Sequence, residues 1–181
     1  MKKLIALLAI ATLGFTGNAN AQKKYGHVNA QEVLTEVPGY AASEKEMERY
    51  RTSKVNQLQD LQKNVQAAYD KYIAEKATLP KSIQKSREKE IQDMQLAAQQ
   101  FEQKAQKQIE EKYLELMEPL TKQLNKAIKD VAKSLGYAYI FDSSQGTLLY
   151  FDGGDDLSAQ IIAQLKKNAA ATAAEEATTP Q

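Results

Sequence analysis

The sequence predicts an α+β protein that is mostly helical, with a long antiparallel helical hairpin projecting from a small body that contains β-strands. Residues 43–134 contain no glycine and two prolines, and they are rich in Lys, Glu, Gln and Ala, which favour helix. A helix rises about 1.5 Å per residue, so residues 43–77 would span roughly 50 Å, more than the width of a small domain. Short aromatic and β-branched stretches on both sides of this run predict the strands.

The first 21 residues have the three parts of a secretory signal peptide. Lys2 and Lys3 form a basic start, residues 4–15 are mostly apolar, and Ala19-Asn20-Ala21 is a small-x-small cleavage site. The apolar part is shorter than the roughly 20 residues that a membrane-spanning helix needs. We therefore expect export to the periplasm and cleavage after Ala21.

Charge and cysteine content exclude several classes of protein. Two of the 24 basic residues and none of the 23 acidic residues lie in the signal peptide, so the mature chain carries a net charge of about −1. A nearly neutral chain argues against nucleic-acid binding through a strong positive field. The absence of cysteine excludes disulfides, thiol nucleophiles and thiolate metal sites.

The mature chain is expected to begin with a strand and a short helix. Residues 25–28 predict the strand. Asn29 is placed to cap the following helix, with Glu32 reaching back to it as in a capping box. The helix should end near Pro38-Gly39, because proline disfavours helix in the residue before it.

Two apolar stripes with spacings of three and four predict the two helices of the arm. The first stripe consists of Leu58, Leu61, Val65, Ala68 and Tyr72. The second consists of Ile91, Met94, Ala98, Phe101, Ala105, Ile109 and Tyr113. Pro80 marks the turn between them, since proline is tolerated in the first turn of a helix.

The second half of the body begins within the return helix. Pro119 is expected to bend that helix, and Gly136 is placed to cap it. Residues 137–141 and 148–151 predict two strands joined as a hairpin.

A short helix with Leu157, Ile161 and Leu165 on one face closes the body. Asp152, Asp155 and Asp156 precede it, and their spacing lacks the alternating ligands of a calcium loop, so we expect a turn and an N-cap there.

Four parts of the chain follow from these elements. They are a signal peptide (1–21), a body (22–42 with 117–167), an arm (43–116) and a tail (168–181) of Ala, Thr and Glu that we expect to be disordered.

Catalytic chemistry has no support in the sequence. His27 is the single histidine and lies in an expected strand, so neither a histidine-based metal site nor a Ser-His-Asp triad is supported. No Gly-Lys-Ser/Thr phosphate-binding motif occurs. We expect no enzyme activity, no cofactor and no metal.

The order of motifs resembles one known family. A strand and helix with the sequence YGHVNAQEVL (25–34) precede a Pro-Gly-Tyr entry (38–40), the helical hairpin, the segment from Pro119 to Asp142 and a closing Asp156-Leu157-Ser158. This pattern resembles the Skp or OmpH family of periplasmic chaperones, and the resemblance extends from Tyr25 to Lys167.

The resemblance implies a homotrimer shaped like a jellyfish, in which strands from three chains form a shared β-body. The three arms would enclose a cavity that holds unfolded outer-membrane proteins without ATP until they reach the outer membrane. It also implies contact with acidic membrane surfaces or lipopolysaccharide. We expect that contact to be weak, because the mature chain is nearly neutral whereas enteric members of the family are strongly basic.

The residues expected to carry this function fall into three groups. Apolar side chains outside the stripes are candidates for client binding, or for contact with a sister arm: Tyr50, Tyr69, Ile73 and Leu96. Basic residues gather at the arm tip, as a solvated helix end or as a contact for acidic surfaces: Lys71, Lys76, Lys81, Lys85, Arg87 and Lys89. The trimer body is expected to use Tyr25, Val28, Tyr139, Ile140, Phe141, Leu149 and Phe151.

A second function class fits the same hairpin. A structural coiled-coil adaptor of the cell envelope would dock end-on through the arm tip, whereas a holdase would use the sides of the arm. Suppression of client aggregation without nucleotide would separate the two classes.

Overall fold

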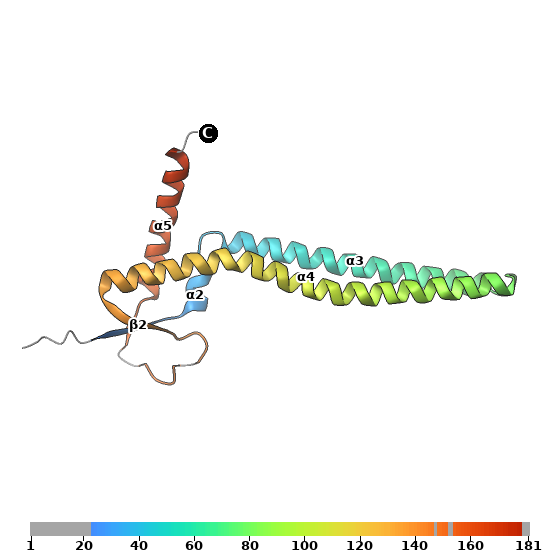
Figure 1. Ribbon diagram of the computed structural model, residues 1–181, viewed down its shortest axis with the longest axis horizontal. Helices are drawn as coiled ribbons and strands as arrows, with labels where there is room; N and C mark the ends of the chain where they lie inside the picture. Colours follow the sequence, from blue (N-terminus) through green and yellow to red (C-terminus); the bar gives the residue numbers. More distant parts are fainter. Residues whose placement is uncertain (1–22, 147, 152–153, 179–181) are drawn as a thin grey trace, which may run out of the picture.

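A computed structural model of the chain describes residues 23–146, 148–151 and 154–178. The elements in chain order are β1 (Lys24–Val28), α2 (Ala30–Thr35), α3 (Tyr40–Glu75), α4 (Lys81–Leu135), β2 (Tyr137–Asp142), β3 (Asp155–Asp156) and α5 (Ser158–Thr178). Helices α3 and α4 form one long hairpin that projects from a base containing the other elements (Figure 1). This confirms a mostly helical α+β fold with a projecting arm. The signal peptide and Asp152 lie outside the described residues.

The turn at the arm tip is where Pro80 predicted it. Helix α3 ends at Glu75 and α4 begins at Lys81, with Pro80 at the N-cap position. The Gln84 side-chain amide donates to the backbone oxygens of Lys76 (3.0 Å) and Leu79 (2.9 Å). These bonds satisfy carbonyl groups that the end of α3 leaves without helical partners.

The two stripes form the seam between the two helices of the arm, and many of the seam side chains are only partly buried. Leu58, Leu61 and Val65 are half-buried, and the arm residues with the lowest exposure are Met47, Tyr72, Ile91, Ala98 and Ala105.

The prediction for Tyr113 is wrong, because 45% of its surface is exposed. Lys112, one residue earlier, faces α3 instead and pairs with Glu46 at 2.8 Å, which raises the pKa of Lys112.

Polar contacts across the seam set the register of the two helices. The Lys54 ammonium donates to Gln108 Oε1 (2.9 Å) and lies over the rings of Tyr50 (5.1 Å) and Phe101 (5.9 Å). Near the tip, the Tyr72 hydroxyl donates to Glu88, and this bond raises the pKa of Tyr72. Directional contacts of this kind disfavour sliding of one helix along the other, which an apolar seam alone would resist weakly.

The three strands form a parallel sheet in the order β2-β1-β3. The predicted hairpin is therefore wrong, because the described residues 148–151 are irregular and β3 comes from Asp155–Asp156, which we expected to be a turn. The burial of Leu157 draws β3 alongside β1, where the Leu157 amide donates to the carbonyl of His27 (2.9 Å). Gly26 permits this approach, since a Cβ there would lie 2.8 Å from Leu157 Cδ1.

A single hydrophobic cluster fills the base. The strand β1, the segment around α2, the second half of α4 and α5 contribute its members. They are Val28, Val33, Val37, Met117, Leu120, Leu124, Ala127, Val131, Leu157, Ile161 and Leu165. The stripe on α5 is confirmed as a buried face, with Leu157, Ile161 and Leu165 each at most 2% exposed.

The start of α2 is capped as predicted, with one different partner. Asn29 Oδ1 accepts from the amide of Glu32 (3.1 Å). The expected return bond from the Glu32 side chain is replaced, because the Asn29 amide donates to Ser158 Oγ (3.3 Å) at the start of α5. The bond to Ser158 joins the start of α2 to the start of α5.

Helix α4 runs through Pro119 without interruption and bends gently on its way into the base (Figure 1). It ends at Gly136, whose φ of 74° is the left-handed conformation that favours glycine, and the Gly136 amide donates to the carbonyl of Ala132. The cap predicted at Gly136 is thus confirmed.

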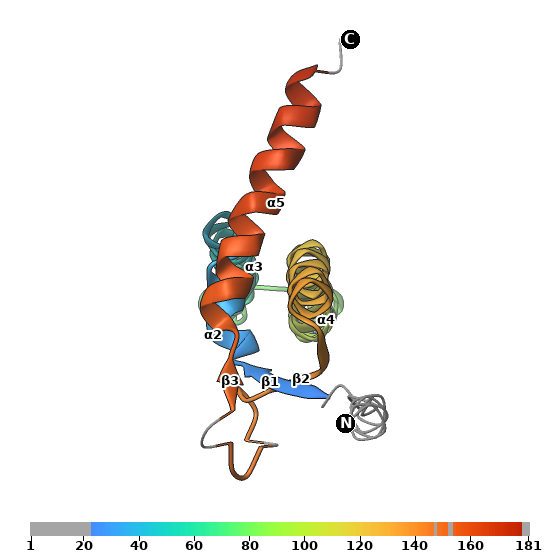
Figure 2. The same ribbon diagram turned by 90° about the vertical axis from the view of Figure 1, so that its left-hand side faces the viewer.

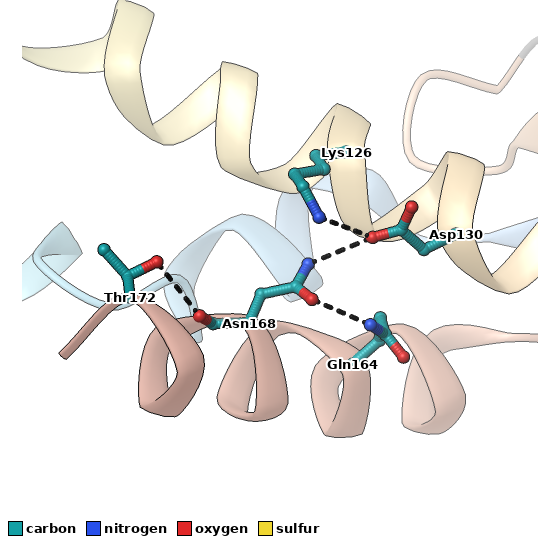
Figure 3. Close-up of polar contacts among 5 residues, drawn as sticks. All are labelled: Lys126, Asp130, Gln164, Asn168 and Thr172. Carbon is teal, nitrogen blue, oxygen red and sulfur yellow. Dashed lines mark hydrogen bonds and ion pairs between the residues drawn. The ribbon is translucent and has the colours of Figure 1, made fainter. Parts of the chain in front are cut away.

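The expected disorder of the tail is wrong for residues 168–178, because α5 continues to Thr178. Asn168 joins the extension to α4 (Figure 3): its side-chain nitrogen donates to Asp130 (3.3 Å) and its side-chain oxygen accepts from Gln164 (2.8 Å). Alanine has the highest helix propensity, so a helix started by the buried stripe continues through an alanine-rich segment. None of the described helices is both long and apolar enough to cross a membrane.

The base core should dominate the stability of the chain. Replacing Ile161, which is fully buried, by Ala should lower the free energy of unfolding by about 2–5 kcal/mol. The same substitution at Ile73, half of whose surface is exposed on the arm, should change it by about 0.5 kcal/mol or less. Urea unfolding followed by circular dichroism measures both. Equal effects of the two substitutions would contradict the assignment of the core to the base.

Candidate functional site

Three aromatic rings lie together on the outer face of the sheet. The parallel register places Tyr25 opposite Tyr139, and their rings stack with centroids 5.6 Å apart and an interplanar angle of 7°. Phe141 extends the stack, 6.5 Å from Tyr25 and 6.3 Å from Tyr139. We call these three residues the aromatic face; each is between 43% and 54% exposed.

A second group of exposed apolar side chains lies after β2 in the chain. The connection from β2 to β3 contains Leu149, Tyr150 and Phe151, which are 96%, 79% and 47% exposed. We call residues 148–151 the apolar loop. It hangs from the side of the sheet opposite to the hairpin (Figure 2). Its end is anchored, since the Phe151 ring packs on His27 with centroids 4.7 Å apart and the Gly154 amide donates to the carbonyl of Phe151 (3.0 Å).

The structure separates the seven residues expected in the trimer body into two groups. Val28 is 2% exposed and Ile140 is half-buried, and both pack in the chain's own core. Tyr25, Tyr139 and Phe141 form the aromatic face, and Leu149 and Phe151 belong to the apolar loop. Five of the seven side chains are therefore available for contacts outside the chain.

The acidic residues beside His27 have hydrogen-bond partners, whereas the buried Nδ1 of His27 has none among the described residues. His27 is 8% exposed on the central strand, beneath Phe151. The Tyr137 hydroxyl donates to Asp155 (2.6 Å), which raises the pKa of Tyr137. Asp156 accepts from the side chain and backbone of Ser158, and these bonds lower the pKa of Asp156. The described residues contain no group of three or more His, Asp or Glu side chains placed to hold a metal ion.

The four candidate client-binding residues differ in how much of each side chain is exposed. Tyr69, Ile73 and Leu96 are 48%, 50% and 53% exposed along the arm. Tyr50 is half-buried, with the Lys54 ammonium over its ring. It therefore contributes to the seam as well as to the surface.

Further apolar side chains are exposed on the arm, and the sequence prediction omitted them. Val55, Ile83 and Leu114 are 51%, 43% and 59% exposed. All three lie outside the two stripes, so the criterion that selected Leu96 would also have identified them. The arm thus presents single apolar side chains along its length, and no continuous apolar groove is needed to account for them.

The arm tip carries both signs of charge. Lys76 lies 3.9 Å from Glu88, Arg87 2.8 Å from Glu90, and Lys89 2.8 Å from Asp93. The other three cations of the tip, Lys71, Lys81 and Lys85, are exposed and form no ion pair with a described residue. Exposed pairs contribute little to stability, but they halve the positive charge available for an acidic partner.

Comparison with known proteins places this geometry in a family. A family model described as "Outer membrane protein (OmpH-like)" matches residues 24–165. The chaperone protein Skp of Photorhabdus luminescens is 27% identical over 167 residues, which cover 92% of this chain and all of that protein. The Skp chaperone of Photorhabdus laumondii is 26% identical over the same length.

A solved structure shares the fold. It is a crystal structure of an OmpH-like outer membrane chaperone from Caulobacter crescentus, with a TM-score of 0.69 over 86% of this chain and 92% of that one. Its sequence identity of 16% supports the fold alone. Because the family model covers most of the chain and the projecting hairpin and small base are both present, this protein belongs to the OmpH-like family of outer membrane chaperones.

Proposed function

We propose that this protein is an ATP-independent holdase of the periplasm, which binds unfolded outer-membrane β-barrel proteins between the arms of a homotrimer. The observation that carries this proposal is the row of separate, half-exposed apolar side chains along the arm, including Tyr69, Ile73 and Leu96. Membership of a chaperone family supports the same class of function.

The arm suits a client that has no fixed structure. Strands of an unfolded β-barrel alternate apolar and polar residues, so a holder needs separated apolar contacts without a fixed register. The seam occupies one stripe of each helix and leaves the other apolar side chains for the client. Many weak contacts shift the client toward its unfolded state and permit release without nucleotide.

The surface of the base supports a trimer. The aromatic face and the apolar loop expose six large apolar side chains on a small sheet, and monomeric proteins rarely leave patches of this kind uncovered. The outer edge of β2 carries backbone groups that a strand from another copy would pair. The signal peptide predicted for residues 1–21 supports a periplasmic site of assembly.

Holdase activity should be visible without nucleotide. When a urea-unfolded outer-membrane barrel is diluted into buffer, a molar excess of this protein should suppress light scattering by the client. The specificity control is an unfolded protein whose sequence rarely alternates apolar and polar residues. Unchanged scattering of the barrel client would refute the holdase and favour the adaptor, which would bind through its tip.

Client affinity should lie on the sides of the arm. Changing Tyr69, Ile73 and Leu96 together to Ser should weaken client binding at least tenfold, because each buried apolar side chain contributes about 1.5–3 kcal/mol at most. Changing the unpaired lysines Lys81 and Lys85 to Gln should chiefly slow association at low salt. Fluorescence titration and stopped-flow mixing measure the two effects. The opposite pattern, in which only the tip variant loses binding, would contradict client binding in a cavity between the arms.

The aromatic face should be required for assembly. Phe141→Asp places a charge in the proposed interface, and since Phe141 is 43% exposed within one chain, the protomer should still fold. Sedimentation velocity should give a trimer for the wild type and a folded monomer for this variant. Leu114→Asp, at an exposed position on the arm, is the matched control and should remain trimeric. A wild-type protein that stays monomeric at micromolar concentration would rule out the trimer.

A further inference from the structure

We propose that His27, Phe151 and Gly154 form a proton-sensitive latch, which holds the end of the apolar loop on the sheet only while the His27 imidazole is neutral. Acid opens the latch and releases that end of the loop. The latch lies within one chain, so it goes beyond the proposed function. Its consequence for the trimer rests on that function and is tested separately.

The imidazole of His27 is buried, and one of its nitrogens has no partner. The side chain is 8% exposed, and Nδ1 makes no hydrogen bond to a described residue. A neutral imidazole has one N–H and one nitrogen without a hydrogen, so Nδ1 can stay unprotonated at little cost. An imidazolium has two N–H groups, and a buried N–H without an acceptor is costly, above all on a charged group. The packing with the latch closed therefore favours the neutral form.

Phe151 and Gly154 cover this imidazole on the face of the sheet that the helices leave open (Figure 2). The Phe151 ring lies over it with centroids 4.7 Å apart and an interplanar angle of 58°. The Gly154 backbone lies at the ring edge, because a Cβ added there would be 3.1 Å from His27 Cδ2. The Gly154 amide donates to the carbonyl of Phe151 (3.0 Å), which joins the two parts of the cover. Moving this cover is the route by which solvent reaches Nδ1.

The cover gives way before the histidine does. His27 is in the central strand, paired with Phe141 on β2 and Asp156 on β3. Its carbonyl also accepts from the Leu157 amide (2.9 Å). The apolar loop, by contrast, is irregular and has two side chains that are at least 79% exposed. A segment with few buried contacts opens at a lower free-energy cost than a paired central strand.

The charged neighbour of His27 is Asp156, its register partner on β3. The Asp156 carboxylate accepts from the amide of Ser158 (2.9 Å). The bonds from Ser158 are the main cause of the lowered pKa of Asp156, and the charge of His27 is the smallest cause. Asp155, one residue earlier, has its side chain on the opposite face of the strand.

The other titratable side chains on or beside the outer face are tyrosines, which in general stay neutral between about pH 5 and 8: Tyr25, Tyr139 and Tyr150. Asp156 is thus engaged at the start of α5, and nothing described here supplies Nδ1 with an acceptor.

The latch is closed in neutral solution and opens in acid. Because the closed state disfavours the proton, it is fully populated where the imidazole is neutral. It is lost as the pH falls through the range, about 5 to 8, in which histidines change charge. Protons cross the water-filled channels of outer-membrane barrels, so the pH of the periplasm follows that of the medium.

The chain has one histidine and no tryptophan, so each partner of the latch can be observed alone. In Phe151→Trp, the indole emission should move to longer wavelength between about pH 8 and 5.5, as the ring leaves the sheet for water. The NMR signal of isotope-labelled His27 Cε1 should change with the same midpoint. If His27 titrates while the indole emission stays constant, protonation occurs with the latch closed and the proposal is overturned.

The Gly154 amide gives a second reading without a substitution in the latch. After correction for the intrinsic effect of pH on exchange, its protection in the wild type should be at least about tenfold lower at pH 5.5 than at pH 8, because the bond to Phe151 is lost. Unchanged protection of this amide would overturn the latch, whatever the tryptophan variant shows.

A variant that moves the histidine is the matched control. His27→Gln combined with Gln160→His keeps one histidine in the chain but places it at an exposed position of α5. Neither the indole emission, measured with Phe151→Trp added, nor the Gly154 amide should then respond to pH. A response as large as that of the wild type would assign the effect to another group and overturn the proposal.

The trimer provides a separate measurement. Sedimentation equilibrium should show a dissociation constant that rises about tenfold from pH 8 to 5.5 in the wild type, and less than about twofold in the variant with the moved histidine. An equal rise in both would overturn the link between the latch and assembly. A wild type that is already monomeric at pH 8 would refute the trimer of the proposed function, whereas the indole and amide measurements would still decide the latch.

Discussion

The packing of α5 against α4 and α2, together with that of the preceding Leu157 against β1, is the contact on which the rest of the structure depends. Ile161 and Leu165 on α5 and Leu157 just before it form one buried face, and their burial brings β3 beside β1. Without this contact the sheet would lose its third strand and the core would lose three of its largest fully buried side chains. The arm cannot compensate, because a two-helix hairpin has one narrow seam and the lowest-exposure positions of α4 within it include two alanines, Ala98 and Ala105.

This division of apolar surface explains how one small chain can be stable and also bind unfolded protein, as we propose. The base buries its large side chains in one cluster, so folding does not rely on the arm. The arm is held in register by polar contacts such as Lys54 with Gln108 and Lys112 with Glu46. Its remaining apolar side chains are then available to a client without being needed for the fold.

The sheet links the fold to assembly. Its inner face is covered by helices, whereas its outer face carries stacked aromatic rings and the anchored end of the apolar loop. In our proposals the outer face and the loop make the trimer, and the trimer positions three arms around a cavity. Side chains that are a liability in one isolated chain would be the interface of the proposed assembly.

The sequence by itself determined the helices, the turn at Pro80, the cap at Gly136 and the family, because helical periodicity and the conformational limits of proline and glycine act locally. It also identified Tyr69, Ile73 and Leu96 as surface residues of the arm, since they lie outside the stripes. Only the tertiary structure decided what depends on distant contacts. Burial of Leu157 made Asp155–Asp156 a strand. Lys112 faces α3 and leaves Tyr113 exposed, and the bond between Asn168 and Asp130 helped carry α5 to Thr178. Residues near one another in the sequence cannot encode these outcomes, because the partner in each case lies far along the chain.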